Sequence, residues 1–202
     1  MEWTKTADET VLGKTADALR ENGFEVYLVE SGDDARKKVV EILPSGAEVL
    51  TVTSKTSESI NLAAEINESG RYVSLRNKLS TMNRETQAAE MNKVGASPEW
   101  VVGSVHAVTQ DGKILIASAS GSQLPAYSYG ARRVIWVVGS QKIVKDIDEG
   151  MKRIYEHTLP LESERARKAY GVPGSSVNKI LIMQKERPGR ITIILVKEAL
   201  GF

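Results

Sequence analysis

Cysteine is absent from this sequence, and histidine occurs only twice in 202 residues. Without cysteine the chain forms no disulfide, offers no thiolate nucleophile and supplies no sulfur ligand to zinc or to an iron–sulfur cluster. The two histidines, His106 and His157, are too far apart in the sequence to form a recognisable metal motif. We therefore expect no metal site and no cofactor held by cysteines of this chain. Any iron–sulfur chemistry must belong to a partner protein.

An excess of one charge is also missing, because 27 Lys and Arg residues stand against 26 Asp and Glu residues. No overall field therefore draws the protein toward nucleic acid or an anionic membrane. Apolar runs such as residues 134–138 are far too short to cross a bilayer. Residues 1–6 are polar and lack the hydrophobic segment of a secretory signal. These observations predict a cytoplasmic protein with neither nucleic-acid nor membrane partners.

The first half of the chain alternates between helical and strand patterns. Leu12, Ala16 and Leu19 recur at helical spacing, and Gly23 stands at the expected left-handed stop. A capping box at Ser31 begins a second helix. Strands are expected at residues 24–29, 49–53 and 72–75, and a third helix at residues 60–66. This alternation predicts a largely parallel sheet covered on both faces.

Two hairpins are expected in the second half of the chain. Asp111-Gly112 tolerates the positive φ angles of a tight turn. This turn is expected to join strands at residues 100–108 and 113–119. A Pro-Gly turn at residues 188–189 is expected to join the last two strands, at residues 180–183 and 191–196.

Helical and strand signals also continue between these hairpins. A buried strand is expected at residues 134–138, and Asp146 is a suitable cap for a helix that Pro160 is expected to end. A short charged helix follows at residues 162–170. No linker or internal repeat divides the chain, so we expect a single α/β domain over residues 1–202. Its expected architecture is a three-layer αβα fold with a mainly parallel sheet and antiparallel hairpins.

Five segments of the sequence resemble one known family. They are Asn22–Tyr27, Ser54–Thr56, Val108–Gly112, Gly139–Asp146 and the stretch from Gly189 to Phe202. The segments are similar to the LUD-domain family, the LutC/YkgG-type lactate-utilisation proteins, and the resemblance covers nearly the whole chain. It implies a NagB/RpiA/CoA-transferase-like α/β fold and a role beside iron–sulfur proteins in lactate oxidation.

The sequence departs from that family at two places. Many members carry a cysteine cluster between the last long helix and the final hairpin, where residues 161–178 contain no cysteine. This departure weakens any metal or cluster role for the chain. His106 stands where the family often has Asn, so it is either a variant group at the site or a neutral substitution.

Small polar loops that directly follow apolar strands mark the expected binding site. In an open α/β sheet such loops gather at the carboxyl ends of the strands, where backbone N–H groups converge. The ligand expected there is a small anion of the phosphate, carboxylate or nucleotide type. The candidate ligand-binding residues are Ser54, Lys55, Thr56, His106, Gly121, Ser122, Gln123 and Lys142.

Several of these residues, and Asp111 in the nearby turn, also have a plainer explanation. Ser54 is a natural N-cap for the helix that follows, and Gly121 is an ordinary turn residue after a strand. Lys142 before a solvated helix is usually a surface charge, and His106 near a strand end is usually a hydrogen-bonded structural residue. Asp111 before glycine is first of all a turn residue rather than a general acid or base.

Three functions remain open from the sequence. The first is a ligand-binding accessory protein in lactate or related organic-acid oxidation that depends on an iron–sulfur oxidoreductase partner. The second is an isomerase- or transferase-type enzyme acting on a phosphorylated or CoA-linked small molecule, although the loops offer no nucleophilic carboxylate for CoA transfer. The third is a non-catalytic assembly protein whose strand edges form a homo-oligomer. Because neither a dinucleotide motif nor cysteine is present, the chain alone is expected to lack redox activity.

Overall fold

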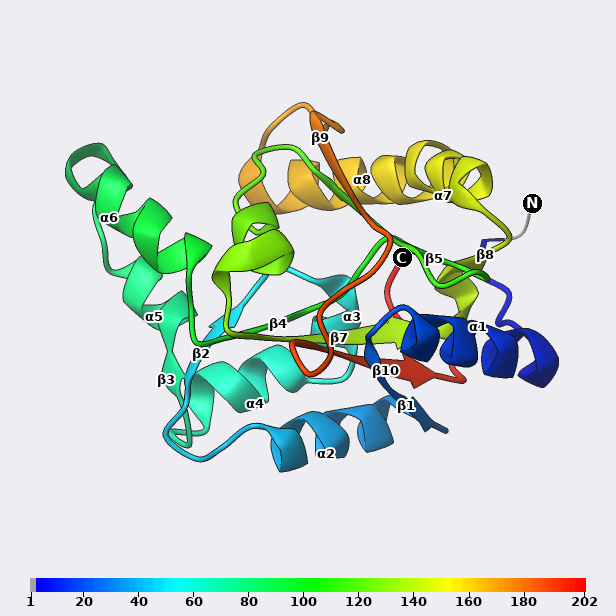
Figure 1. Cartoon of the computed structure of the whole chain (residues 1–202). Helices are drawn as coiled ribbons and strands as arrows, with labels where there is room; N and C mark the ends of the chain where they lie inside the picture. The colour runs from blue at the N-terminus through cyan, green and yellow to red at the C-terminus, as the bar shows by residue number, and fades with distance from the viewer. Residues whose placement is uncertain (1–2) are drawn as a thin grey trace.

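Six parallel strands form the larger of two sheets in the computed structural model, which describes residues 3–202. Their order across the sheet is β1-β10-β7-β4-β2-β3 (Figure 1). The strands are β1 (Glu25–Val29), β2 (Glu48–Thr51), β3 (Val73–Ser74), β4 (Trp100–Gly103), β7 (Arg133–Gly139) and β10 (Ile191–Val196). Every residue of β10 is buried, because a central strand covered on both faces needs an almost continuously apolar sequence.

Helices α2 (Gly32–Ile42) and α4 (Leu62–Glu68) cover one face of this sheet (Figure 1). Ser31 begins α2 as expected, since its hydroxyl oxygen accepts a hydrogen bond from the Asp34 amide at 3.2 Å. The helices bury one apolar side against the sheet through Ala35, Val39, Leu62 and Ile66. The short helix α3 (Lys55–Ser59) follows β2 directly and lies at the carboxyl edge of the sheet.

Helix α1 (Glu9–Glu21) covers the opposite face of the same sheet. Its buried side is formed by Leu12, Ala16 and Leu19, as their spacing predicts. Gly23 has φ +91°, and it allows the chain to turn from the helix into β1. Both predictions from the first helix are confirmed.

A second, four-stranded sheet packs on this side of the molecule in the order β8-β5-β6-β9. Its strands are β5 (Ala107–Thr109), β6 (Ile114–Ser118), β8 (Ile143–Val144) and β9 (Lys179–Met183). β5 and β6 form the expected antiparallel hairpin, and Gly112 in its turn has φ +80°. One face of this sheet joins the main core, and the other packs against the last helices of the chain.

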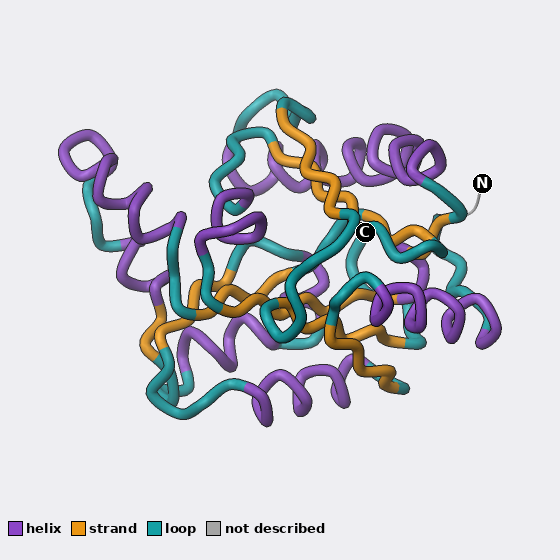
Figure 2. The backbone as a smooth tube through the Cα atoms, viewed as in Figure 1, coloured by secondary structure: helices purple, strands orange, loops and turns teal. Residues whose placement is uncertain are grey.

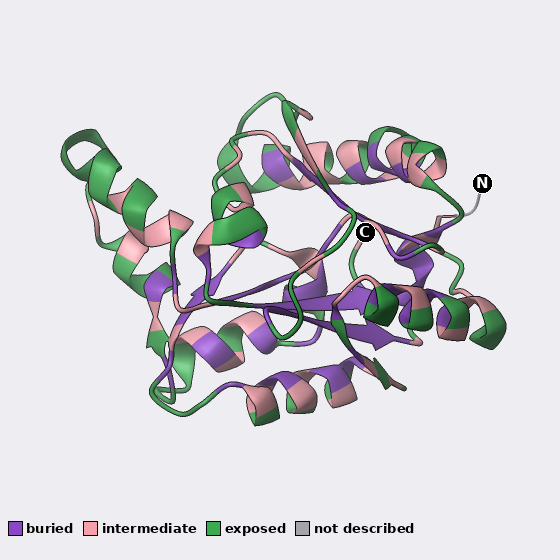
Figure 3. Cartoon of the chain, viewed as in Figure 1, coloured by how far each residue is buried: buried purple, intermediate pink, exposed green. Residues whose placement is uncertain are grey.

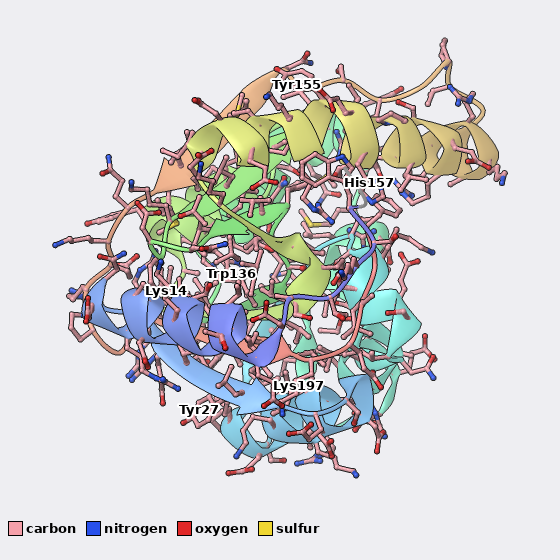
Figure 4. All side chains as sticks on the ribbon, turned by 90° about the vertical axis from the view of Figure 1, so that its right-hand side faces the viewer. Lys14, Tyr27, Trp136, Tyr155, His157 and Lys197 are labelled. Carbon is pink, nitrogen blue, oxygen red and sulfur yellow. The ribbon has the colours of Figure 1, made fainter. Side chains whose placement is uncertain are left out.

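Those last helices form one nearly continuous helical run on the outer face of the second sheet (Figures 1 and 2). It consists of α7 (Ile147–Arg153), a π-helical turn (Ile154–Thr158) and α8 (Leu159–Tyr170). Asp146 caps α7 as predicted, because its carboxylate accepts from the Glu149 amide at 2.9 Å. Tyr155 projects from the outer side of the run and His157 from its inner side (Figure 4).

A helical arm extends from the end of the main sheet that carries β3 (Figure 1). It is formed by α5 (Leu75–Ser80) and α6 (Arg84–Ala96). No residue of α6 is buried, and Figure 3 shows the arm as mostly exposed surface. Helix α6 therefore contributes little to the core, whereas Leu75 at the start of α5 is buried in it.

Three details of the sequence prediction are wrong. Residues 100–108 are not one strand, because β4 joins the parallel sheet and β5 the second sheet. The last two strands form no hairpin: β9 pairs with β6, whereas β10 lies between β1 and β7. Pro160 does not end a helix but lies in the first turn of α8, where its missing N–H costs nothing.

The predicted fold class is confirmed. The molecule is an α/β protein with a mainly parallel sheet between helical layers, to which a mixed sheet and its outer helices are added. Trp136, in the central strand β7, is fully buried between these layers (Figure 4). Over the described part of the chain, none of the helices combines the length and the apolar character that a membrane crossing needs.

Candidate functional site

A cavity of about 1070 Å³ lies at the carboxyl edge of the parallel sheet. Residues that follow β2, β4 and β6 line it, together with residues of the helical arm and of the last helical run. The residues singled out from the sequence all line it, namely Ser54, Lys55, Thr56, His106, Gly121, Ser122, Gln123 and Lys142. The structure therefore gathers these side chains around one space.

The reason for this gathering is only partly the expected one. Ser54–Thr56 follow β2 and Ser140–Lys142 follow β7, two parallel strands whose carboxyl ends share an edge. Gly121–Gln123 instead follow β6, which belongs to the second sheet. Both sheets therefore contribute walls to the cavity.

Lys142 is almost fully buried, with 2% of its surface exposed. Its Nζ donates hydrogen bonds to Thr56 Oγ1 at 2.8 Å, Ser104 Oγ at 3.1 Å and the Val105 carbonyl at 3.2 Å. All three acceptors are uncharged, and no carboxylate within residues 3–202 forms an ion pair with this lysine. The explanation of Lys142 as a solvated surface charge is therefore wrong.

The surroundings of Lys142 disfavour its charged form. Burial, and after it the positive charge of Arg153, lower the pKa of Lys142 to about 7. Near neutral pH the side chain is therefore present both as an ammonium and as a free amine. The first form attracts anions, and the second is a nucleophile and a base.

Arg153 on α7 is a second buried cation, which the sequence analysis missed. It is fully buried, and its Nη1 donates to the His106 carbonyl at 2.6 Å and to Thr158 Oγ1 at 3.1 Å. Its Nε and Nη2 have no hydrogen-bond partner in the part of the chain that the structure describes. Burial lowers the pKa of Arg153 to about 10, so it keeps its charge at neutral pH. The available signal was its position three residues after Gly150, on the face of α7 that packs inward.

The segment Ser104–His106, which joins β4 to β5, holds both cations. Lys142 binds the carbonyl of Val105, and Arg153 binds the carbonyl of the next residue. The Nδ1 of His106 accepts from the Ala117 amide at 3.2 Å, so the neutral ring carries its proton on Nε2. Burial, followed by the charges of Lys142 and Arg153, lowers the pKa of His106 to about 3. At neutral pH this ring lines the cavity as an uncharged donor.

Three other predicted residues have local structural contacts as well. Ser54 is the N-cap of α3, because its Oγ accepts from the Ser57 amide at 3.3 Å. Lys55 forms an ion pair at 2.6 Å with Glu58 on the same helix. Gly121 has φ +84°, and its amide donates to Ser118 Oγ at 2.8 Å. The plainer explanations of Ser54 and Gly121 are therefore correct, and these residues also shape the cavity wall.

The charges that line the cavity are mostly positive. The described lining residues include the basic side chains Lys55, Arg76, Arg84, Lys142 and Arg165 and the single acid Glu162. Glu162 is bound by Arg165 through two contacts of 2.6 and 2.7 Å. The cavity is therefore locally basic, although the whole chain has a net charge of only +1. Within residues 3–202, no cluster of three or more acidic or histidine side chains is placed to hold a metal ion.

The end of the described chain also reaches this site. Thr56 Oγ1 donates to the Leu200 carbonyl at 3.1 Å, and Gln141 Nε2 donates to the same carbonyl at 2.9 Å. Gly201 has φ +65°, and a Cβ at this position would lie 2.6 Å from Thr56 Oγ1. The close approach brings Phe202 to the cavity wall. Neither Gln141 nor this final segment was among the candidate ligand-binding residues.

Comparison with known protein families shows which family this chain belongs to. The sequence model of the LUD domain matches residues 12–196. The chain belongs to the LUD-domain family. Among solved structures, this LUD domain is similar to a DUF162-family protein from Deinococcus radiodurans, with 12% identity and a TM-score of 0.57 over 95% of this chain and 99% of that chain. At this identity the likeness shows the fold alone, and it agrees with the α/β architecture.

A second solved structure, eIF2B beta from Chaetomium thermophilum, matches this LUD domain with 19% identity and a TM-score of 0.38. The match covers 58% of this chain and 44% of that chain, and it carries no functional argument. Among curated proteins, no match is found.

Proposed function

We propose that this LUD domain binds an organic anion in the cavity, with Lys142 at the binding site. The observation that carries the proposal is the pair of buried cations, Lys142 and Arg153, for which no carboxylate partner exists within residues 3–202. Buried charges in proteins are usually paired, because an isolated one loses its hydration without compensation. An anion in the cavity supplies the missing negative charge.

The two cations contribute to binding in different ways. Lys142 lines the cavity, and its positive charge attracts an anion although its three N–H groups already bind protein acceptors. Arg153 is not among the described lining residues, but its Nη1 binds Thr158, which is one of them. Arg153 therefore acts through its electric field, which a poorly hydrated interior screens only weakly.

The size of the cavity favours an anion larger than lactate. Its volume of about 1070 Å³ is slightly above the range of roughly 300–1000 Å³ for sites that enclose drug-sized ligands. Arg76 and Arg84 at the cavity wall suit a phosphate, and the positive charge of Lys142 lines the same cavity. A phosphorylated or nucleotide-type organic anion therefore fits better than a small carboxylate.

The proposal includes an accessory role in lactate or related organic-acid utilisation. Its support is family membership together with the absence of cysteine from the sequence, which leaves cluster chemistry to a partner. In this role the domain supplies the anion site, and an iron–sulfur oxidoreductase supplies the redox centre. Lactate oxidation by the isolated domain would contradict this assignment.

Titration calorimetry with phosphate, lactate and a nucleoside monophosphate tests the anion site. We expect at least one of these anions to bind, and Lys142→Met to weaken that binding by at least about 10-fold, as is typical for loss of a charge-assisted contact. Lys152→Met, on the exposed side of α7, is the matched control and should bind like the wild type.

The same experiment gives a second readout. A bound anion favours the ammonium and raises the pKa of Lys142, which is about 7 in the free protein. Binding slightly above pH 7 should therefore take up protons, and the measured heat should change with the ionisation enthalpy of the buffer. Equal affinity in Lys142→Met and Lys152→Met, or no binding of any anion tested, would overturn the proposed function.

A further inference from the structure

Lys142 has the surroundings of a nucleophilic amine as well as those of an anion ligand. Enzymes that use lysine as a nucleophile activate it by removing it from water or by placing another cation beside it. Both conditions hold for Lys142, because it is 2% exposed and the charge of Arg153 acts on it. Burial beside a second cation therefore fits a nucleophilic amine as well as an anion ligand.

The hydrogen bonds around Nζ leave room for a free amine. The Thr56 hydroxyl donates to the Leu200 carbonyl, so toward Lys142 it can only accept. The Val105 carbonyl is also an acceptor. These two contacts use two N–H groups, which is the number that a neutral amine has. The third contact, with Ser104 Oγ at 3.1 Å, can reverse because a hydroxyl is both donor and acceptor.

We infer that Lys142 forms an imine with the carbonyl group of an anionic aldehyde or ketone bound in the cavity. The inference rests on the proposed function, because the anion site is what brings the carbonyl carbon to Nζ. Arg76 and Arg84 hold the anionic end of this ligand at the cavity wall, and the carbonyl end reaches Lys142. The substrate class is therefore a phosphorylated or carboxylated carbonyl compound.

The step balances without an oxidant or a reductant. The lone pair of Nζ attacks the carbonyl carbon, and the π electrons of the C=O bond move to oxygen. One proton passes from nitrogen to that oxygen, which gives a carbinolamine. The oxygen then leaves as water with the second amine proton, and the C=N bond forms.

Two neighbouring groups can assist these steps, Ser104 by passing a proton and His106 by donating a hydrogen bond. Ser104 Oγ lies 3.1 Å from Nζ and can pass a proton between nitrogen and the departing oxygen. His106 lines the same cavity and carries its proton on Nε2, so it can donate to the carbonyl oxygen without bearing a charge. A neutral donor is favourable here, since another cation would add to the charge of Arg153.

Reductive trapping tests the inference. The wild-type protein is incubated with pyruvate or glyceraldehyde 3-phosphate and sodium cyanoborohydride, and the product is examined by intact-mass and peptide mass spectrometry. We expect a single reduced adduct on Lys142. At pH 7 the free-amine fraction of a lysine whose pKa is about 7 exceeds that of an ordinary lysine by about 10³-fold. Labelling should therefore reach half of its maximal rate near neutral pH.

Variants check the assignment. Lys142→Arg keeps a cation but cannot form an imine, so it should lose the adduct, whereas Lys152→Arg should keep it. If Lys142→Arg does not fold, the peptide map of the wild-type protein decides alone. Adducts spread over exposed lysines, or formed at Lys55 instead of Lys142, would overturn the inference.

Phosphate separates this inference from the proposed function, because it is an anion that cannot form an imine. Binding of phosphate without any adduct at Lys142 overturns the imine and leaves the anion site in place. Absence of anion binding and of the adduct together overturns both.

Discussion

Arg190 and the pair formed by Lys142 and Arg153 are buried cationic groups at opposite edges of the parallel sheet. Arg190 directly precedes β10 at the amino edge, and it forms an ion pair at 2.6 Å with Glu186. Its guanidinium also donates to two backbone carbonyls. One belongs to Tyr127 in the neighbouring π-helical turn (Ala126–Gly130), and the other to Ala131, the residue after that turn. Lys142 and Arg153, at the carboxyl edge, have only uncharged partners within residues 3–202.

The presence or absence of a carboxylate partner distinguishes a cation with a structural role from cations whose charge is not balanced within the protein. The charge of Arg190 is neutralised by Glu186, so this group needs no ligand to balance it. Lys142 and Arg153 lose hydration on burial and regain no opposite charge, so they reduce the stability of the ligand-free protein. In the proposed function, their favourable contribution comes from binding an anion.

The largest expected effect comes from breaking the neutralised pair. Glu186→Ala leaves Arg190 buried without its carboxylate and should lower the free energy of unfolding by about 3 kcal/mol. Glu58→Ala removes a half-exposed ion pair from α3 and should cost about 0.5 kcal/mol or less. Urea unfolding at pH 7 measures both changes. Equal losses in the two variants would show that burial does not distinguish these ion pairs.

An effect of intermediate size is expected from pH. The pKa of Lys142 is about 7 in the folded protein, whereas an unfolded lysine has a pKa of roughly 10.4. Between these values the unfolded chain binds more protons, so the free energy of unfolding rises with pH, by at most about 1.4 kcal/mol per pH unit. We expect a gain of about 2 kcal/mol from pH 7 to pH 9 after allowance for partial hydration.

Lys142→Met should remove this gain, because it removes the titrating group. Lys152→Met should keep it, since that lysine is exposed. The measurement is urea unfolding of the three proteins at a series of pH values. A pH dependence that persists in Lys142→Met would assign the effect to another group and would contradict the burial argument.

The position of the candidate site in the fold was predictable from the sequence, but the burial of its charged side chains was not. Loops after apolar strands are recognisable locally, and this identified Ser54–Thr56 and Lys142. Whether a lysine after such a strand is solvated depends on what covers it, and Lys142 is covered by residues as distant as Ser104 and Thr56. Arg153 was missed for the same reason, since its neighbour Lys152 is exposed and the helix resembles a solvated one.

The fold shows the same division between local and distant information. Periodicity and caps correctly predicted α1, α2 and α7 because those signals lie within each helix. The Pro-Gly turn before β10 suggested a hairpin, but the partners of β10 come from distant parts of the chain, β1 and β7. The continuously apolar sequence of β10 is typical of a central parallel strand. This pattern indicates the observed position of β10 more reliably than the preceding Pro-Gly turn does.

The smallest expected effect is at the outer wall of the cavity. The Lys55 side chain is 41% exposed and pairs with Glu58, so Lys55→Ala should change the free energy of unfolding by about 0.5 kcal/mol or less. Its influence on an anion in the cavity crosses solvent, so affinity should fall by about 3-fold at low salt. This difference should disappear near 1 M salt, where the screening length is roughly 3 Å.

The buried Lys142 is screened much less, so Lys142→Met should weaken binding at every salt concentration. Calorimetry of both variants with phosphate across a salt series makes the comparison. If Lys55→Ala proves the more damaging change, the anion is held at the outer wall, and the unpaired charge of Lys142 does not explain binding.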